Sequence, residues 1–453
     1  MTLQHLTLAA DGFDLSVLHQ RAPQRYPFLL ESVAAHPQSG RWDILFAEPG
    51  ESLRGHRRRL TADGVGIESE DFFAELDRWV ARETPQPRND DLPFIGGWFF
   101  LLGYEAARWV EPQLQLPDSP HALPDALAVR CRAAVIHDRE QQLLHLISET
   151  GASGIARLRD DFEALRGAAP DASQPWTATS INDQAPERFT EGVVRILDWL
   201  RAGDVFQINL SRPWDARIPD TVCPASLYRR LRQTNPAPFA GILRWGDSAV
   251  ISSSPERLLQ IDGRTAQTRP IAGTRRRGVD AAEDAQLRTV LLANLKERAE
   301  HVMLIDLERN DLGRVCEPGS IVVSELMALE SYAHVHHIVS NVQGKLRSGL
   351  GPGAALRAVF PGGTITGCPK VRAMQIIAEL EGEGRGPYTG SMGYLSRDGR
   401  MDSNILIRSL VWEAGRLRLR TGAGIVADSE PQAELEETRA KARGLLLALE
   451  RGA

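Results

Sequence analysis

The chain has 453 residues, 42% hydrophobic and 25% charged, with a formal net charge of −6, which allows a large buried core and lacks the overall basic character of nucleic-acid-binding proteins. Its four cysteines are far apart and none has CxxC spacing, which argues against a disulfide framework or a zinc site. The N-terminus has no signal-peptide pattern and no apolar run is long enough to span a membrane, so we expect a cytoplasmic protein without nucleic-acid or membrane partners.

The first 166 residues mix strand-like segments with loops and two predicted helices. RWDILFAEP and ALAVRCRAAVIHD predict strands. DFFAELDRWVARE predicts a helix, because its apolar residues fall on one face at helical spacing, and ASGIARLRDDFEALRG predicts another. Residues 167–185 are rich in Ala, Pro, Ser and Asp, so we expect a linker there, between an N-terminal domain (1–166) and a second domain (186–453).

The second predicted domain has a more regular pattern. ERFTEGVVRILDWLRAG predicts an amphipathic helix that ends at Gly203. AVISSSPERLLQID and RTAQTRPIAG predict two strands around a hairpin at Asp262-Gly263, and AEDAQLRTVLLANLKERAEHVMLIDLERND predicts one long helical region. Because hairpins and long helices alternate irregularly, we expect an α+β fold with large, mostly antiparallel sheets packed as a sandwich and helices outside.

Two pairs of glutamates have a spacing of three. Glu297 and Glu300 share one face of a predicted helix, and Glu434 and Glu437 share one face of another. Four such carboxylates suit Mg²⁺, which prefers oxygen ligands. The alternative is a pair of solvated helix faces with Glu–Arg contacts, and the spacing taken alone favours that alternative.

Glu256 and a group of histidines are the other titratable candidates. Glu256, in SSSPER, can act as a general acid if the fold encloses it, and is a surface glutamate otherwise. HVHH contains His334, His336 and His337. Strand alternation places His336 and His337 on opposite faces, which argues against a metal cluster.

Gly422 and Gly424, in TGAGIVA, end a predicted strand a few residues before the acidic C-terminal helix. Glycine lets an anion approach the backbone closely. A bulge or tight turn is an equally good explanation. PGGTITGCPK, another glycine-rich loop, precedes a helix but lacks the GxxxxGK[ST] spacing of a P-loop.

Taken in order, these segments form a longer pattern. GDVFQINLSR, SSSPERLL, RPIAGT, KERAEHVMLIDLERNDLGRV, FPGGTITGCPKVRAMQII and TGAGIVADSEPQAELEET together resemble the chorismate-utilising enzymes from Gln184 to Leu449. PFLLES and RWDILFAEP extend the resemblance to the amino-transferring branch of that family, so that it covers nearly the whole chain.

The resemblance implies roles for individual residues. Glu300 and Glu437 would hold Mg²⁺ against the ring carboxylate of chorismate, with Glu297 and Glu434 close by. Glu256 would protonate the departing carbon-4 hydroxyl, and His337 would lie near the ring. The implied substrate contacts are Gly273, Thr274, Tyr388, Arg408, Gly422, Gly424 and Lys441.

Positions 207 and 272 bear on the branch of the family. Water-adding members carry a lysine base where this chain has Gln207, which cannot deprotonate water, so we expect ammonia as the nucleophile. Many aminodeoxychorismate synthases read PIKGT, with a lysine that attacks carbon 2 before ammonia enters at carbon 4. Anthranilate synthases, which add ammonia at carbon 2 and eliminate pyruvate, read PIAGT, as this chain does with Ala272.

Other segments favour a different branch of the family from the one that Ala272 indicates. QINLSR, SPERLL, FPGGTITG, MDSNILIR and FIGGWFFLLGYE resemble the aminodeoxychorismate branch. On these segments we expect component I of an aminodeoxychorismate synthase, with component I of an anthranilate synthase as the alternative. A non-catalytic chorismate-binding subunit is a further alternative, against which the presence of Glu256, Glu300 and Glu437 argues.

The resemblance also implies partners. Ser32, at the end of LLES, together with Trp42, Pro238 and Phe239 resembles a tryptophan pocket, although core packing is the simpler explanation. The chain contains no recognisable glutaminase domain, so we expect a separate glutamine amidotransferase subunit to supply ammonia.

Overall fold

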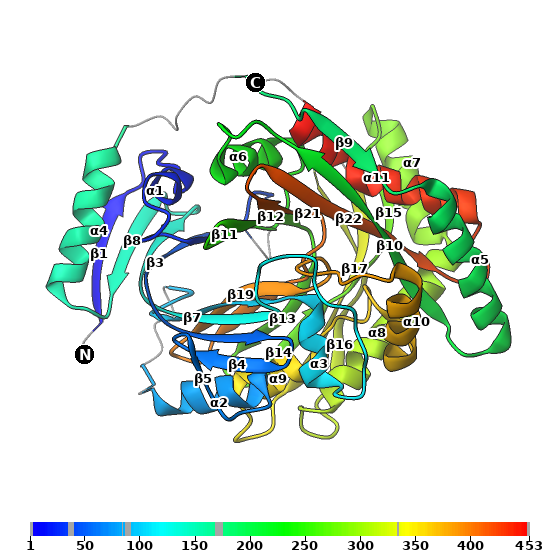
Figure 1. Cartoon of the computed structure of the whole chain (residues 1–453), viewed down its shortest axis with the longest axis horizontal. Coiled ribbons are helices and arrows are strands. Elements are labelled where there is room, and N and C mark those ends of the chain that lie inside the picture. The colour runs from blue at the N-terminus through cyan, green and yellow to red at the C-terminus, as the bar shows by residue number, and fades with distance from the viewer. Residues whose placement is uncertain are drawn as a thin grey trace.

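The strands of the protein form one continuous antiparallel sheet. The computed structural model describes residues 3–34, 40–83, 85–86, 92–167, 175–332 and 335–450. Antiparallel pairings link all 22 strands in these ranges, and the helices lie mainly around the outside of the sheet (Figure 1). The predicted α+β class with large antiparallel sheets and external helices is confirmed.

The first part of the chain contributes eight strands and four α-helices to the described structure. The strands are β1 (Gln4–Ala9), β2 (Phe28–Glu31), β3 (Trp42–His56), β4 (Arg59–Ala62), β5 (Val65–Gly66), β6 (Gly97–Leu102), β7 (Ala126–Asp138) and β8 (Leu143–Ser148). The helices are α1 (Ser16–Arg21), α2 (Phe72–Arg82), α3 (Ala107–Val110) and α4 (Ala152–Leu165).

The rest of the chain contributes the remaining elements. The helices are α5 (Pro186–Ala202), α6 (Pro224–Thr234), α7 (Ala281–Ala293), α8 (Leu295–Gly313), α9 (Pro352–Val359), α10 (Lys370–Glu381) and α11 (Pro431–Glu450). The strands are β9 (Ser180–Asp183), β10 (Gln207–Arg217), β11 (Phe239–Trp245), β12 (Ser248–Ser254), β13 (Arg257–Asp262), β14 (Thr265–Arg269), β15 (Ile271–Arg276), β16 (Val322–Ser331), β17 (Val335–Lys345), β18 (Gly367–Cys368), β19 (Ser391–Ser396), β20 (Met401–Asn404), β21 (Ser409–Glu413) and β22 (Arg416–Ile425).

Local sequence signals fix several element ends. Asp71 caps α2, because its side chain accepts hydrogen bonds from the backbone N–H groups of Phe73 and Ala74. Helix α5 ends at Gly203, which has φ +80°. Asp262 pairs with Thr265 across the β13–β14 hairpin. These predictions of helix and hairpin are confirmed.

The long helical region predicted from residue 281 is two helices. Asn294 interrupts it with an extended backbone, φ −70° and ψ 110°. Its side-chain oxygen accepts a hydrogen bond from the N–H of Glu297 at 3.2 Å and so caps α8. The prediction of one helical region was wrong at this point, and the break places Glu297 and Glu300 near the N-terminus of α8.

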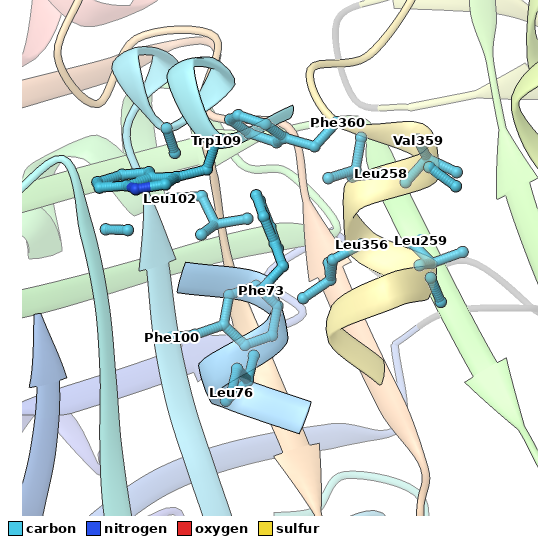
Figure 2. Close-up of a cluster of buried hydrophobic side chains, with 14 of the residues drawn as sticks. Phe73, Leu76, Phe100, Leu102, Trp109, Leu258, Leu259, Leu356, Val359 and Phe360 are labelled. Atoms are coloured by element: carbon cyan, nitrogen blue, oxygen red, sulfur yellow. The ribbon is translucent and has the colours of Figure 1, made fainter. Parts of the chain in front are cut away.

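The two predicted domains share strand pairings and a core. β2 pairs with β11, and β6 pairs with β19. Residues 180–183 of the predicted linker form β9, which pairs with β10, while residues 168–174 lie outside the described ranges. Figure 2 shows Phe73 of α2 and Phe100 of β6 beside Leu356 of α9. The domain division stays a prediction, and both parts position the site described below.

No helix in the described ranges is long and apolar enough to cross a bilayer.

Candidate active site

The predicted site residues come from strands and helices that are in contact. β10 pairs with β22, and β15 pairs with β17. Helix α8 contacts β15 and β17, while α11 packs on β22. These elements carry Gln207, Ala272, His337, the four glutamates and the two glycines of TGAGIVA, so residues more than 200 positions apart in sequence meet in one region.

Glu256 lies in the short connection between β12 and β13, where it is 4% exposed. Burial raises its pKa to about 7, although hydrogen bonds from Thr364 and the backbone of Ile271 and the charges of Lys441 and Arg408 act in the opposite direction. Its Oε1 atom has no hydrogen-bond partner among the described residues. At neutral pH much of this carboxyl group holds a proton, which is the state a general acid needs.

Gly273 forms a bulge in β15. Ala272 is opposite Ile338 and Thr274 is opposite His337, so Gly273 is the extra residue, and its φ of +73° favours glycine. The hydroxyl of Thr274 lies 2.9 Å from Nδ1 of His337. Ala272 is 6% exposed and brings only a methyl group to this strand.

His337 is a buried, neutral imidazole. Burial, together with the nearby charge of Arg408, lowers its pKa to about 3. Its Nε2 atom has no hydrogen-bond partner within the described part of the chain. His336 faces the other way, toward Asp284 at 3.0 Å and Ser331 at 2.7 Å, which confirms the predicted alternation. His334 lies outside the described residues.

Gly422 and Gly424 face side chains of β10 and occupy regular strand positions. A Cβ atom at position 424 would lie 2.6 Å from Nε2 of Gln207, and one at position 422 would lie 2.6 Å from Oδ1 of Asn209. Their register is Ser211 with Gly422 and Asn209 with Gly424, and neither glycine has a positive φ. The alternative of a bulge or turn does not apply, because the glycines make room for polar side chains.

The four glutamates lie on the two helices that border this region, and Glu300, Glu437 and Glu297 have polar contacts there. Gln207 donates from Nε2 to Oε1 of Glu300 at 3.1 Å. Glu437 pairs with Lys441 at 2.7 Å, and Glu297 pairs with Arg275 at 3.1 Å, as the alternative of Glu–Arg contacts predicts for Glu297. Glu434 is 8% exposed on α11.

The oxygen donors of these glutamates are the ligand type that Mg²⁺ prefers. Within the described residues, however, no three acidic, histidine or cysteine side chains converge closely enough to hold a metal ion. The glutamates therefore fit a magnesium site in donor chemistry, and their convergence on one ion stays a prediction.

The remaining predicted substrate contacts border the same region. Lys441 donates from Nζ to the carbonyl oxygen of Gly422 at 3.0 Å. The hydroxyl oxygen of Tyr388 would be 3.0 Å from a Cβ at position 422. Arg408 has φ +50°, an uncommon conformation outside glycine, and its charge acts on Glu256 and His337.

Buried polar atoms without a partner gather here, and one of their residues was not singled out from the sequence. Apart from the atoms of Gln207, Glu256 and His337, they include Oδ1 of Asn209, again counting only partners in the described ranges. Because buried polar groups normally have partners, such a group of atoms indicates a ligand site. Asn209 was open to prediction, since it lies two residues after Gln207 and so on the same strand face.

A cavity of about 990 Å³ lies beside β2, β3 and β11. Ser32, Trp42, Pro238 and Phe239 all line it, so the structure brings the predicted pocket residues together. Arg257, the neighbour of Glu256 in sequence, lines it as well. The residues therefore border an open space instead of a filled core.

Comparison with known proteins identifies the family. The model of the chorismate binding enzymes matches residues 27–447. Anthranilate synthase component 1 of Thermus thermophilus is 43% identical, over 96% of this chain and 94% of the relative. Aminodeoxychorismate synthase component 1 of Bacillus subtilis is 36% identical, over 94% of this chain and 92% of the relative.

Among solved structures, the crystal structure of anthranilate synthase component I from Streptococcus pneumoniae matches with a TM-score of 0.82 and 33% identity, covering 91% of this chain and 93% of that one. The chain belongs to the chorismate-binding enzyme family.

Proposed function

We propose that this chain is component I of an anthranilate synthase, which converts chorismate and ammonia to anthranilate and pyruvate. Ala272 is the observation that carries this proposal. Carbon-4 amination through a covalent lysine adduct needs an amine at this position, and the chain offers a buried methyl group. The name of the 43% identical relative from Thermus thermophilus supports the same choice.

The other lysines do not replace the missing amine. The sequence contains four: Lys296, Lys345, Lys370 and Lys441. Lys441 borders the site, but its amine already pairs with Glu437 and with the carbonyl oxygen of Gly422. Lys345 pairs with Glu317 and Lys370 pairs with Asp311, while the side chain of Lys296 lies outside the described set.

The chemistry we propose uses Glu256 as the general acid. The ammonia lone pair forms a bond to carbon 2, the ring double bonds shift, and the carbon-4–oxygen bond breaks. Glu256 gives its proton to the departing hydroxyl, which leaves as water, and the new ammonium group returns a proton to the site. Loss of the carbon-2 hydrogen and of the enolpyruvyl group as pyruvate then makes the ring aromatic.

Magnesium is the expected cofactor, with Glu300 and Glu437 as its ligands and Glu297 and Glu434 nearby. When bound, it would neutralise the ring carboxylate of chorismate. A separate glutamine amidotransferase subunit would supply ammonia. Tryptophan is the ligand we propose for the cavity lined by Ser32, Trp42, Pro238 and Phe239.

Product analysis tests the proposal. The purified protein is incubated with chorismate, Mg²⁺ and an excess of ammonium salt, with and without aminodeoxychorismate lyase, and Glu256→Gln is the matched inactive control. Anthranilate without the lyase supports the proposal. Para-aminobenzoate that appears only with the lyase contradicts it, and unchanged chorismate supports a non-catalytic binding subunit.

Aminodeoxychorismate synthase component I is the second candidate. QINLSR and the other segments that resemble this branch favour it, as does the Bacillus subtilis relative. With Ala272 in place, carbon-4 amination would need ammonia or water to add first at carbon 2, so the second candidate requires an additional displacement step.

A further inference from the structure

Asn209 is a buried residue whose side-chain oxygen has no hydrogen-bond partner within the described ranges. The residue is 8% exposed on β10. Its backbone N–H donates to the carbonyl oxygen of Thr366 at 2.8 Å, and its own carbonyl oxygen accepts from Nη2 of Arg385 at 2.8 Å. Oδ1 has no partner among the described residues. An unpaired buried acceptor is unfavourable, so a ligand contact is the natural explanation.

The side chain of Asn209 is directed at Gly422. Oδ1 would be 2.6 Å from a Cβ atom at position 422, and the hydroxyl oxygen of Tyr388 would be 3.0 Å from the same point. Two polar side chains, from β10 and from the loop before β19, thus border one small space that exists because residue 422 is glycine. Gln207 lies on the same face of β10 and borders Gly424 in the same way.

Arg385 contacts the backbone of Asn209 and the ring of Tyr388. Its guanidinium donates to the carbonyl oxygen of Asn209 and to that of Ile365 at 3.0 Å, and it lies 5.7 Å from the ring centre of Tyr388. The group is 1% exposed and is paired with Glu381 at 2.7 Å. Asn209 and Tyr388 therefore share one rigid support, which suits residues that define a binding geometry.

Hydrogen-bond donors beside Gly422 suit an anionic ligand group. Nζ of Lys441 is 3.0 Å from the carbonyl oxygen of Gly422, and the Tyr388 hydroxyl is a hydrogen-bond donor. The nitrogen and oxygen of an amide exchange places by a half turn about the last bond, and here no described protein group fixes the choice. Asn209 can therefore present its NH₂ group to a carboxylate.

We propose that Asn209 is a substrate-contacting residue that, together with Tyr388, donates a hydrogen bond to the carboxylate of the enolpyruvyl side chain of chorismate. The inference rests on the proposed function, which places the ring carboxylate at Glu300. Chorismate has two carboxylates, and the second one needs donors at a distance from the glutamates. Asn209 is then a residue that recognises the substrate.

Direct measurement of chorismate binding by calorimetry, with Mg²⁺ and without ammonia, tests Asn209. Asn209→Leu keeps the size and removes the donor, and we expect the dissociation constant to rise about 10- to 100-fold. Asn209→Asp adds a negative charge beside the carboxylate, and we expect a larger rise. Asn182→Asp, an exposed position on β9, is the matched control for the added charge and should leave binding unchanged.

Two outcomes would overturn the inference: wild-type affinity in Asn209→Leu, or affinity in Asn209→Asp equal to or tighter than wild type, which would make the residue an acceptor for a hydroxyl or for ammonia. Asn209→Ser, which adds neither bulk nor charge, carries the test if the other variants melt early by circular dichroism. The binding assay is independent of the product formed. If anthranilate does not form but the wild type still binds chorismate, the proposed function fails and the binding data for the Asn209 variants still test the inference.

Discussion

Two buried carboxyl groups, Glu256 and Glu381, have opposite surroundings. Glu256 and Glu381 are both 4% exposed. Burial raises the pKa of Glu256 to about 7, and its Oε1 has no described partner. Burial acts on Glu381 as well, but the charges of Arg385 and Arg420 and the hydrogen bonds of Ser211 overcome it and lower its pKa. Equal burial thus gives a carboxylic acid at Glu256 that can donate a proton and a carboxylate at Glu381 that pairs with buried arginines.

The difference separates a ligand site from its support. Along one face of β10, Gln207 and Asn209 keep side-chain oxygens unpaired, while Ser211, the next residue on that face, donates to Glu381 at 2.8 Å. The partners of Glu381 are Arg385 at 2.7 Å and Arg420 at 2.9 Å. The unpaired groups can serve a ligand because the neighbouring groups are fully paired.

The largest expected effect is the loss of the acid. Glu256→Gln keeps the shape and removes the proton, so we expect kcat with ammonium salt to fall about 10²- to 10⁴-fold. In the wild type, kcat/KM should decrease as the pH rises through about 7, because the acid loses its proton. Steady-state kinetics from pH 6 to 9 measure both at a fixed concentration of free ammonia, because ammonium loses its proton as the pH rises. Activity that is constant across this range would contradict the assignment.

The stability of the same variant should change in the opposite direction. The pKa of Glu256 is higher in the folded chain than in the unfolded chain, so its contribution to stability is complete below pH 4.5 and is lost as the pH rises through about 7. Glu256→Gln removes this loss. Denaturant unfolding at pH 8 should find the variant at least as stable as the wild type.

Removing the negative charge of Glu381 should instead destabilise the fold. Glu381→Gln leaves Arg385 and Arg420 buried with one charge missing, and we expect the free energy of unfolding to fall by about 3–5 kcal/mol. Since the pKa of Glu381 is lowered in the folded chain, its stabilisation is present above the ordinary value of 4.5 and is lost on acidification. Glu383→Gln, a half-buried neighbour that also pairs with Arg420, is the control and should cost less. Equal losses of unfolding free energy in the two variants would show that buried Glu381 stabilises the fold no more than half-buried Glu383.

A methyl group at residue 422 tests the space between the two regions. In Gly422→Ala the new Cβ would be 2.6 Å from Oδ1 of Asn209 and 2.7 Å from the backbone oxygen of Leu210. We expect about 1–3 kcal/mol of destabilisation from this crowding, and a clear loss of chorismate affinity in the protein that still folds. Gly66→Ala, on β5, is the control, because its Cβ meets no atom within 4 Å and its φ is not positive. Unchanged chorismate binding in Gly422→Ala would place the ligand elsewhere.

Sequence reasoning predicted what depends on neighbours along the chain. Asp71 and Gly203 mark helix ends by their own backbone preferences, and the spacing of Glu297 and Glu300 placed both on one helix. Asn294 could not be predicted as a break, because the residues around it favour helix and its cap forms only in the folded chain. Ser32 and Pro238 were predicted to share one pocket because of the resemblance, since no local sequence pattern relates them.

The partners of buried charges were equally out of reach of the sequence. Arg385 follows the end of α10 and bonds to backbone oxygens of β10 and of the loop before β18, which no spacing encodes. Asn209 is visible in QINLSR, but its unpaired amide becomes apparent only when every neighbour has been placed. The site is thus recognised from the sequence by its motifs and from the structure by its unpaired groups.

The smallest expected effect concerns two adjacent glutamates on α11. Glu436 pairs with Arg439 and Glu437 pairs with Lys441, both at 2.7 Å, and their side chains are 56% and 48% exposed. Exposed pairs of this kind contribute only about 0–1 kcal/mol, so Glu436→Gln and Glu437→Gln should both unfold at nearly the wild-type denaturant concentration.

Of these two glutamates, only Glu437 is an expected magnesium ligand beside Gly422. Calorimetry should therefore find weaker Mg²⁺-dependent chorismate binding in Glu437→Gln and wild-type binding in Glu436→Gln. Equal binding in the two variants would assign Glu437 to the surface and remove it from the site.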